Sequence, residues 1–414
     1  MCNSPLRRGI GILLSVVLAP LLFTTLVDSS AAFADPIGAK DALSDVVTAR
    51  IVASADPRDG RRVTEADAQV NVMRTEAEWA FGSAVAVAPP VPDAYPQGWL
   101  FVAHREDGRW TVAFEGDVAF PWLTAAAPVD LVSASEKKLF ASHGAPTRAV
   151  LEKVEGGDAN RAAKPTAGGD YRTGMRLPYA IGQSWRLTGG PHGAARQSID
   201  LAGGDGRVLA ARTGTFYVMC ASGRGWVRVV HDRGYSTDYY HLWNNRTAGG
   251  TVNEGTFLGD IGTDVSCGGS ATGPHNHFSL RQNSVNVGIA AHNFGKWQPY
   301  NGAAEYQGYA LHGSARATIG GSLYNYGALG FTQAVVDANG GGVVNRRAGP
   351  GSGHAVVGTV TDGATVTIAC SARGTSHTGR FDYTTDMWNR LTDGSWISDA
   401  YSWTGTGNPV NGWC

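Results

Sequence analysis

The chain has 414 residues, a net charge of −1 at pH 7, 17% charged residues and 56 glycines. This length exceeds what one typical core holds, so we expect two or three domains. The balanced charge argues against an electrostatic nucleic-acid binder, and the many glycines favour a turn-rich, mainly β protein.

The N-terminus has the pattern of a secretory signal peptide. Arg7-Arg8 precede an apolar run from Ile10 to about Val27, and Ala32-Phe33-Ala34 has the small residues of a cleavage site. We predict a signal peptide over residues 1–34 and a secreted, extracellular or wall-associated protein. The alternative is a transmembrane anchor, which is disfavoured because the apolar run is only just long enough and ends in polar residues and a cleavage-like site. No later segment is apolar enough to span a bilayer, so no membrane partner is expected after signal removal.

Four cysteines remain once Cys2 leaves with the signal peptide, an even number in an exported chain. Three pairings are possible. Proximity in sequence favours Cys220–Cys267 and Cys370–Cys414, which would place one bridge in each of two domains.

Residues 35–165 are predicted to form a small α+β unit followed by a linker. A helical pattern lies within Pro36–Ala53, and three strands follow. These strands are Trp79–Ala88, Trp99–Arg105 and Trp110–Phe114. The unit carries no recognisable chemistry, so we interpret it as a pro-region that assists folding or blocks an active site. A retained accessory domain is the alternative. The polar stretch Glu152–Thr173 is predicted to be an exposed linker and a processing site.

Residues 166–330 are predicted to form a mainly antiparallel β domain. Short alternating strands are separated by glycine-rich turns, and no long amphipathic helix is evident. The clearest strands are Ser198–Leu201, Gly214–Ala221, Trp226–Asp232, Tyr235–Leu242 and His277–Gln282.

Histidines and one aspartate give this region its chemistry. His275 and His277 are one residue apart, so a strand would carry both imidazoles on one face. A hydrolytic zinc needs three ligands from histidine and carboxylate, an open position for water, and acid-base groups nearby. His192, Asp200 and His241 supply further candidates beside glycine turns or on short strands. The alternative for each residue taken alone is a structural role.

The set resembles the lysostaphin-type zinc endopeptidases, which include the beta-lytic enzymes and cut peptidoglycan cross-bridges. The resemblance covers about residues 176–315. Its motifs are Gly190-Pro191-His192 to Asp200, Tyr240-His241-Leu242, Gly255–Gly262 and Gly273-Pro274-His275-Asn276-His277-Phe278. It implies a lysostaphin-like antiparallel fold and one zinc ion per chain.

Carried over by position, the resemblance implies zinc ligands at His192, Asp200 and His277. It implies acid-base roles for His241 and His275. Seven residues separate His192 from Asp200, a longer gap than in the lysostaphin-like branch but similar to the beta-lytic branch. That branch also uses a downstream tyrosine to stabilise the transition state. Four tyrosines compete for the role, and Tyr324 is preferred over the others, which are Tyr306, Tyr309 and Tyr326.

Residues 340–414 resemble a bacterial SH3-like β-barrel of the kind that targets cell walls. The motifs are Val344–Pro350, Val357-Gly358 and Trp396-Ile397-Ser398. Four tryptophans exceed what a core of this size needs, so we expect at least two to be buried and the others to suit stacking on sugars or glycine-rich peptides. They are Trp388, Trp396, Trp403 and Trp413.

The sequence therefore predicts a secreted zinc metalloendopeptidase that hydrolyses peptide bonds in peptidoglycan cross-bridges, made as a precursor and acting as a monomer. Peptidoglycan is the expected partner, and no nucleic acid is expected. Two alternatives stay open. One is a general secreted protease that cuts glycine-rich proteins, and the other is a non-catalytic cell-wall-binding scaffold.

Overall fold

The structure is a computed structural model that describes residues 42–56, 62–92, 94–143 and 169–414. The expected signal peptide and most of the expected linker lie outside these residues. The described residues belong to one structural unit that spans residues 34–414. No helix in the described part of the chain is long and apolar enough to cross a membrane.

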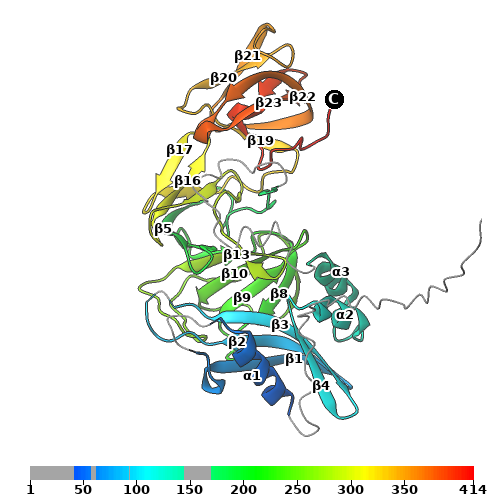
Figure 1. The fold of residues 1–414 in the computed structure, drawn as a ribbon. Coiled ribbons are helices and arrows are strands. Elements are labelled where there is room, and N and C mark those ends of the chain that lie inside the picture. Colours follow the sequence, from blue (N-terminus) through cyan, green and yellow to red (C-terminus); the bar gives the residue numbers. More distant parts are fainter. Residues whose placement is uncertain (1–41, 57–61, 93, 144–168) are drawn as a thin grey trace, which may run out of the picture. The chain divides into compact units, whose positions relative to one another are not determined.

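Residues 42–143, here called the N-terminal segment, form a four-stranded antiparallel sheet with three α-helices and one 3-10 helix (Figure 1). The strand order is β1-β2-β3-β4. The elements are α1 (Leu43–Ser54), the 3-10 helix η1 (Glu65–Asp67), β1 (Ala68–Glu76), β2 (Trp79–Ala86), β3 (Gln97–Glu106), β4 (Arg109–Phe114), α2 (Ala119–Ala126) and α3 (Ala134–Ser142). The sequence predicted α1 and the last three strands, but not β1, α2 or α3.

Both faces of this sheet are covered, which explains the nearly continuous apolar sequence of β2. Ala80 and Ala84 pack with Ile51 of α1 on one face. Phe81 and Val85 point to the opposite face, because side chains alternate along a strand. There they share one apolar cluster with residues far along the chain, including Tyr217, Met219, Trp226 and Tyr240.

Residues 169–330, the central segment, are built on a nine-stranded antiparallel sheet. Its order is β11-β8-β9-β10-β13-β6-β5-β18, with β14 paired to β13. The strands are β5 (Ser184–His192), β6 (Ser198–Gly203), β8 (Gly214–Val218), β9 (Gly225–Val230), β10 (Tyr235–Leu242), β11 (Gly250–Val252), β13 (Asn276–Gln282), β14 (Val285–Asn286) and β18 (Ser322–Tyr324). This agrees with the mainly β, antiparallel fold class predicted for the region.

Two small sheets complete the central segment. The first sheet pairs β7 (Arg207–Leu209) with β12 (Phe257–Asp260). The second sheet has the order β15-β16-β17, and its strands are β15 (Gln298–Asn301), β16 (Gly308–His312) and β17 (Ala315–Thr318). The Cys220–Cys267 disulfide links the end of β8 to the loop before β13, as expected.

Residues 331–414, the C-terminal segment, contain a seven-stranded sheet in the order β21-β20-β24-β23-β22-β19-β25. The strands are β19 (Gln333–Val336), β20 (Val343–Arg347), β21 (Val356–Thr361), β22 (Thr365–Thr378), β23 (Thr384–Leu391), β24 (Trp396–Ser398) and β25 (Ser402–Trp403), with 3-10 helices η2 (Arg380–Asp382) and η3 (Asp399–Tyr401). The expected Cys370–Cys414 disulfide is present. Trp388 and Trp403 are buried, and Trp413 is 52% exposed.

Candidate metal centre

Strand β13 holds one expected ligand between two neighbouring strands. His277 pairs with Asp200 on β6 and with Tyr240 on β10. Phe278 and Leu280 point into the apolar core, so His277 points to the opposite face. This register places Nδ1 of His277 3.2 Å from Oδ1 of Asp200. Two of the three expected ligands are therefore cross-strand neighbours.

His192 reaches the same place because β5 is irregular. Its pairing with β6 shifts register on both sides of Gly189, and such bulges redirect side chains. Gly189 also leaves the necessary space, since a Cβ there would lie 2.5 Å from Oδ2 of Asp200. Nε2 of His192 lies 3.5 Å from Oδ1 of Asp200 and 3.1 Å from Nδ1 of His277. The three expected ligands thus converge.

The spacing of the three ligand atoms suits a tetrahedral zinc ion. Bonds of about 2.0 Å at tetrahedral angles separate ligand atoms by about 3.3 Å. The observed separations are 3.1, 3.2 and 3.5 Å. Oδ1 of Asp200 is buried and has no hydrogen-bond partner among the described residues. A cation would satisfy this atom, so the residues fit a metal ion.

The expected protonation states also suit metal binding. Burial lowers the pKa of His192 to about 4, although Asp200 opposes the shift. Nδ1 of His192 donates to the carbonyl of Gly190 at 2.7 Å, which leaves the Nε2 lone pair for a metal. Burial also opposes ionisation of Asp200, but His192, His277 and His275 outweigh it and hold the pKa of the carboxyl below its usual value. Neutral imidazole and ionised carboxylate are the forms that bind zinc.

His275 lies beside this cluster without being one of its three members. It comes just before β13, and its Nε2 lies 3.5 Å from Oδ1 of Asp200. Nδ1 of His275 donates to the carbonyl of Gly273 at 2.7 Å. The second nitrogen is therefore available to exchange a proton near the cluster.

His241 is turned toward the cluster by a bulge in β10. The pairing of β10 with β9 is irregular between Tyr239 and Leu242, and His241 itself has a φ of 68°. Its ring consequently stacks on that of Tyr240 at 4.3 Å and lies 4.8 Å from the ring of His275. Burial lowers the pKa of His241 to about 3, and the neighbouring histidines add to the shift. The imidazole is neutral at pH 7.

The structure does not bring Tyr324 to the ligand cluster. Tyr324 ends the edge strand β18, is 42% exposed, and lies with its ring 4.7 Å from that of Tyr326. Tyr306 is the tyrosine of the expected group that lies at the cluster. Its ring stacks on that of His192 at 4.1 Å, and its carbonyl accepts a hydrogen bond from the backbone of Gly190 at 3.0 Å.

A tyrosine from the N-terminal segment also lies at the cluster. The ring of Tyr95 lies 4.8 Å from that of His277 and 5.5 Å from that of His192. The hydroxyl of Tyr95 contacts the hydroxyl of Tyr306. This position could not be predicted from the sequence, because Tyr95 follows β2 in a stretch without recognisable chemistry and contacts these residues only in the folded chain.

A cavity of about 310 Å³ adjoins the cluster between the N-terminal and central segments. One side is formed by residues of β13 and its neighbours, and the other by residues at the start of β3. Among the lining residues are His277, Ser279, Arg281, Asp238, Tyr95, Gly98 and Trp99. The residues at positions 277, 279 and 281 share one face of β13 because they alternate.

The geometry defines a candidate metallohydrolase, and comparison with known proteins narrows the class. The family model described as "Peptidase family M23" matches residues 194–288 of this chain. These residues include Asp200, His241, His275 and His277. Beta-lytic metalloendopeptidase of Lysobacter enzymogenes is 31% identical over 126 residues, covering 26% of this chain and 69% of the relative. The chain therefore belongs to peptidase family M23.

Protease LasA of Pseudomonas aeruginosa is 32% identical over 148 residues, which cover 32% of this chain and 35% of LasA. The match thus spans about a third of the length of that relative. Among solved structures, the novel M23 metalloprotease pseudoalterin from the deep sea is 29% identical with a TM-score of 0.33, covering 36% of this chain and 97% of pseudoalterin.

Proposed function

We propose that this protein is a secreted zinc metalloendopeptidase that hydrolyses peptide bonds in peptidoglycan cross-bridges. The observation that carries the proposal is the convergence of His192, Asp200 and His277, with His241 and His275 beside them. Membership of family M23 and the name of the beta-lytic metalloendopeptidase relative support the peptidase activity. The choice of peptidoglycan rests on the resemblance described for the sequence.

His192, Asp200 and His277 would hold the zinc ion. Bound there, zinc supplies a Lewis acid that lowers the pKa of a water to about 7. Nε2 of His275, close to the ligand carboxylate, accepts the proton of the attacking water. His275, protonated in this way, then returns the proton to the leaving amine. His241 donates from Nδ1 to the carbonyl of Asp264 at 2.9 Å, so its second nitrogen carries a lone pair that accepts a hydrogen bond from the attacking water. Both histidines act from fixed tautomers.

Tyr306, in place of Tyr324, is the tyrosine that we assign to transition-state stabilisation. Its ring lies against that of His192, a proposed zinc ligand, and its hydroxyl contacts the hydroxyl of Tyr95. With Tyr95 displaced, this hydroxyl would donate to the oxyanion that forms on the attacked carbonyl.

The N-terminal segment is proposed to be a pro-region that is removed by cleavage in the linker after residue 143. The support is Tyr95, which lies over the ligand His277, and the N-terminal residues that wall the adjoining cavity. A substrate peptide needs the same space. The proposal therefore includes a latent precursor and an active, shorter enzyme.

The C-terminal segment is proposed to be an SH3-like wall-binding domain of a monomeric enzyme. Trp413 is half-exposed, and the guanidinium of Arg373 lies 4.8 Å from the centre of its ring. An exposed aromatic ring of this kind can stack on a sugar or a glycine-rich peptide.

The test uses the secreted, processed protein on purified cell walls. We expect release of new amino termini from walls, loss of this release with a chelator, and its return with zinc. His192→Ala should abolish it, whereas His354→Ala should not, because His354 is exposed in the C-terminal segment. Full activity of His192→Ala would contradict the proposal. Faster cleavage of elastin or casein than of walls would favour the general protease, and a zinc-free, inactive wild type would favour the scaffold.

A further inference from the structure

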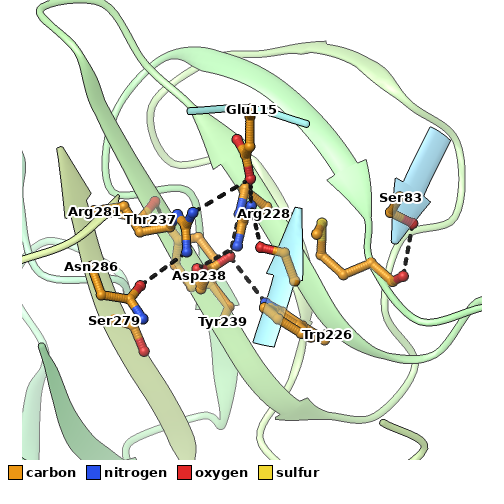
Figure 2. A network of polar contacts seen from close by, with 12 residues as sticks. Ser83, Glu115, Trp226, Arg228, Thr237, Asp238, Tyr239, Ser279, Arg281 and Asn286 are labelled. Carbon is orange, nitrogen blue, oxygen red and sulfur yellow. Dashed lines mark hydrogen bonds and ion pairs between the residues drawn. The ribbon is translucent and has the colours of Figure 1, made fainter. Parts of the chain in front are cut away.

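A buried charge network joins the N-terminal segment to the central sheet (Figure 2). Arg228 on β9 is fully buried and donates to both carboxylate oxygens of Asp238 on β10, at 2.7 and 3.0 Å. Glu115, which follows β4, accepts from the other arm of Arg228. Oε1 of Glu115 also lies 3.5 Å from Nη2 of Arg281. One carboxylate of the N-terminal segment thus lies between two arginines.

The charges of this network do not balance within the central segment. Asp238 is committed to Arg228 and to the indole of Trp226, which donates to it at 3.0 Å. Among the described residues, Glu115 is the one carboxylate within ion-pair distance of Arg281. The central segment therefore supplies two guanidinium groups and one carboxylate, and the N-terminal segment supplies the missing negative charge.

Within the described residues of the central segment, Arg281 makes hydrogen bonds only to neutral groups, so no hydrogen-bonded residue of that segment compensates its charge. Its Nη1 donates to Asn286 at 3.0 Å, and its Nη2 donates to the carbonyl of Ser284. Its Nε is buried without a hydrogen-bond partner in the described structure. Burial, followed by repulsion from Arg228, lowers the pKa of Arg281 to about 10. An anion at the position of Glu115 offsets this unfavourable burial.

The arginines lie on the same sheet face as the metal ligands. His277, Ser279 and Arg281 alternate along β13 and line one cavity. Four residues of strand place Arg281 about 13 Å from His277 along β13. An extended peptide covers this distance with about four residues.

We propose that Arg281 and Arg228 form a carboxylate-binding subsite of the substrate groove, which Glu115 occupies in the precursor. This inference rests on the proposed function, because the subsite opens only when the N-terminal segment leaves. The ligand is an extended peptide that carries a free carboxylate, from a side chain or a chain end, about four residues from the bond that is cut. Two guanidinium groups around one carboxylate already bind that chemistry in this structure.

The first test needs no catalysis and uses the full chain. Glu115→Ala should lower the Tm and leave a space between the two arginines. Acetate should restore several degrees of Tm in this variant, whereas neutral acetamide should not. Glu106→Ala, at an exposed carboxylate, should show no response to acetate. Arg281→Met in the Glu115→Ala background should remove the acetate effect. Equal responses to acetate and acetamide would contradict a carboxylate subsite.

The second test uses the processed enzyme and paired peptides that carry a carboxylate or a carboxamide at the same position. Scanning that position on both sides of the scissile bond should find a preference of about tenfold or more in kcat/KM for the carboxylate, of the size a charge-assisted bond gives. Arg281→Met should bring the ratio close to one, and Arg246→Gln, at an exposed arginine, should keep it. Equal cleavage of all pairs would overturn the subsite. Cleavage of neither peptide would overturn the proposed function, and the acetate test would then decide the subsite.

Discussion

The ring of Tyr95 stacks on the imidazole of His277, with ring centres 4.8 Å apart and an angle of 23° between the planes. The two residues come from different segments of the chain. Because His277 is an expected zinc ligand, a side chain of the N-terminal segment covers the place where a substrate carbonyl would have to bind. The contact would give the proposed latency of the precursor a specific atomic cause.

Replacing Tyr95 should therefore make the metal site of the uncut precursor more accessible to a chelator. Tyr95→Ala removes a stacking contact of about 0.5–1.5 kcal/mol, so we expect about a 2- to 10-fold rise in the rate at which a chelator extracts zinc. Stopped-flow detection with a chromogenic chelator measures this rate. Tyr326→Ala, which changes an exposed tyrosine away from the cluster, is the control. Unchanged extraction in Tyr95→Ala would show that the ring does not cover the metal.

The two histidines at the start of β13 should respond differently to mutation. His277→Ala removes a ligand and should lose both zinc and activity. His275→Ala should keep about one zinc per chain and lose activity by about 10²- to 10⁴-fold, the usual contribution of an acid-base group. Metal analysis of the purified variants, together with wall hydrolysis, separates the two cases. Loss of zinc in His275→Ala would make this residue a ligand instead.

A single methyl group at Gly189 should weaken the metal site. Its Cβ would lie 2.5 Å from Oδ2 of Asp200, so the carboxylate must move away from His192 and His277. We expect zinc affinity to fall by about 10- to 100-fold, as for other changes that misplace a ligand. Competition with a chelator of known affinity measures the change. Gly353→Ala, where a Cβ would meet nothing within 4 Å, should leave the affinity unaltered.

Acid should loosen the N-terminal segment from the central segment after the linker is cut. Burial lowers the pKa of His143 to about 4, while the carbonyl of His231 and Asp232 oppose the shift and Arg281 and Arg228 add to it. The released segment has an exposed His143 with a pKa of about 6.5 and therefore binds a proton between pH 6.5 and 4 that the attached form does not. Attachment should weaken by up to about tenfold per pH unit across this range.

Glu136 also lies where the two segments meet. Burial raises its pKa, but hydrogen bonds from Arg74 and Tyr217 outweigh this and hold the pKa below its usual value. Arg74 belongs to the N-terminal segment and stays beside Glu136 after release, so we assign the loss of attachment in this pH range to His143. Gel filtration of the cut protein at several pH values measures attachment. A flat profile above pH 4.5 would exclude His143, and His143→Gln should flatten it.

The sequence predicted most strands because alternation is a local pattern, and the three ligands that the resemblance implied lie together in the structure. Alternation marks β9, β10 and β13, and the blocks around His192, Asp200 and His277 retain a recognisable order. It could not identify Tyr306 or Tyr95, since the backbone contact of Tyr306 with Gly190 and the stacking of Tyr95 on His277 arise from long-range folding. The preference for Tyr324 had no motif behind it, and the structure places that residue on an edge strand.

The charge network and the helices α2 and α3 were missed for a related reason. Glu115 and Arg228 are separated by 113 positions, so neither residue carries a sign of its partner. The helices are short, with 8 and 9 residues, and much of their stabilisation comes from the apolar cluster that they share with Tyr217 and Trp226. The helical repeat of apolar residues is hard to recognise in a sequence segment this short.

The start of the central segment is tied to the far end of the chain. Asp170 forms a bridge with Thr406, the backbone of Tyr171 donates to Gly405 at 2.9 Å, and Arg172 donates to the carbonyl of Phe331 at 2.7 Å. Cleavage before residue 169 would therefore create a new amino terminus that these contacts already hold against the C-terminal segment. Trimming by aminopeptidases should stop close to Asp170, which would give the mature enzyme a uniform first residue however imprecise the initial cut.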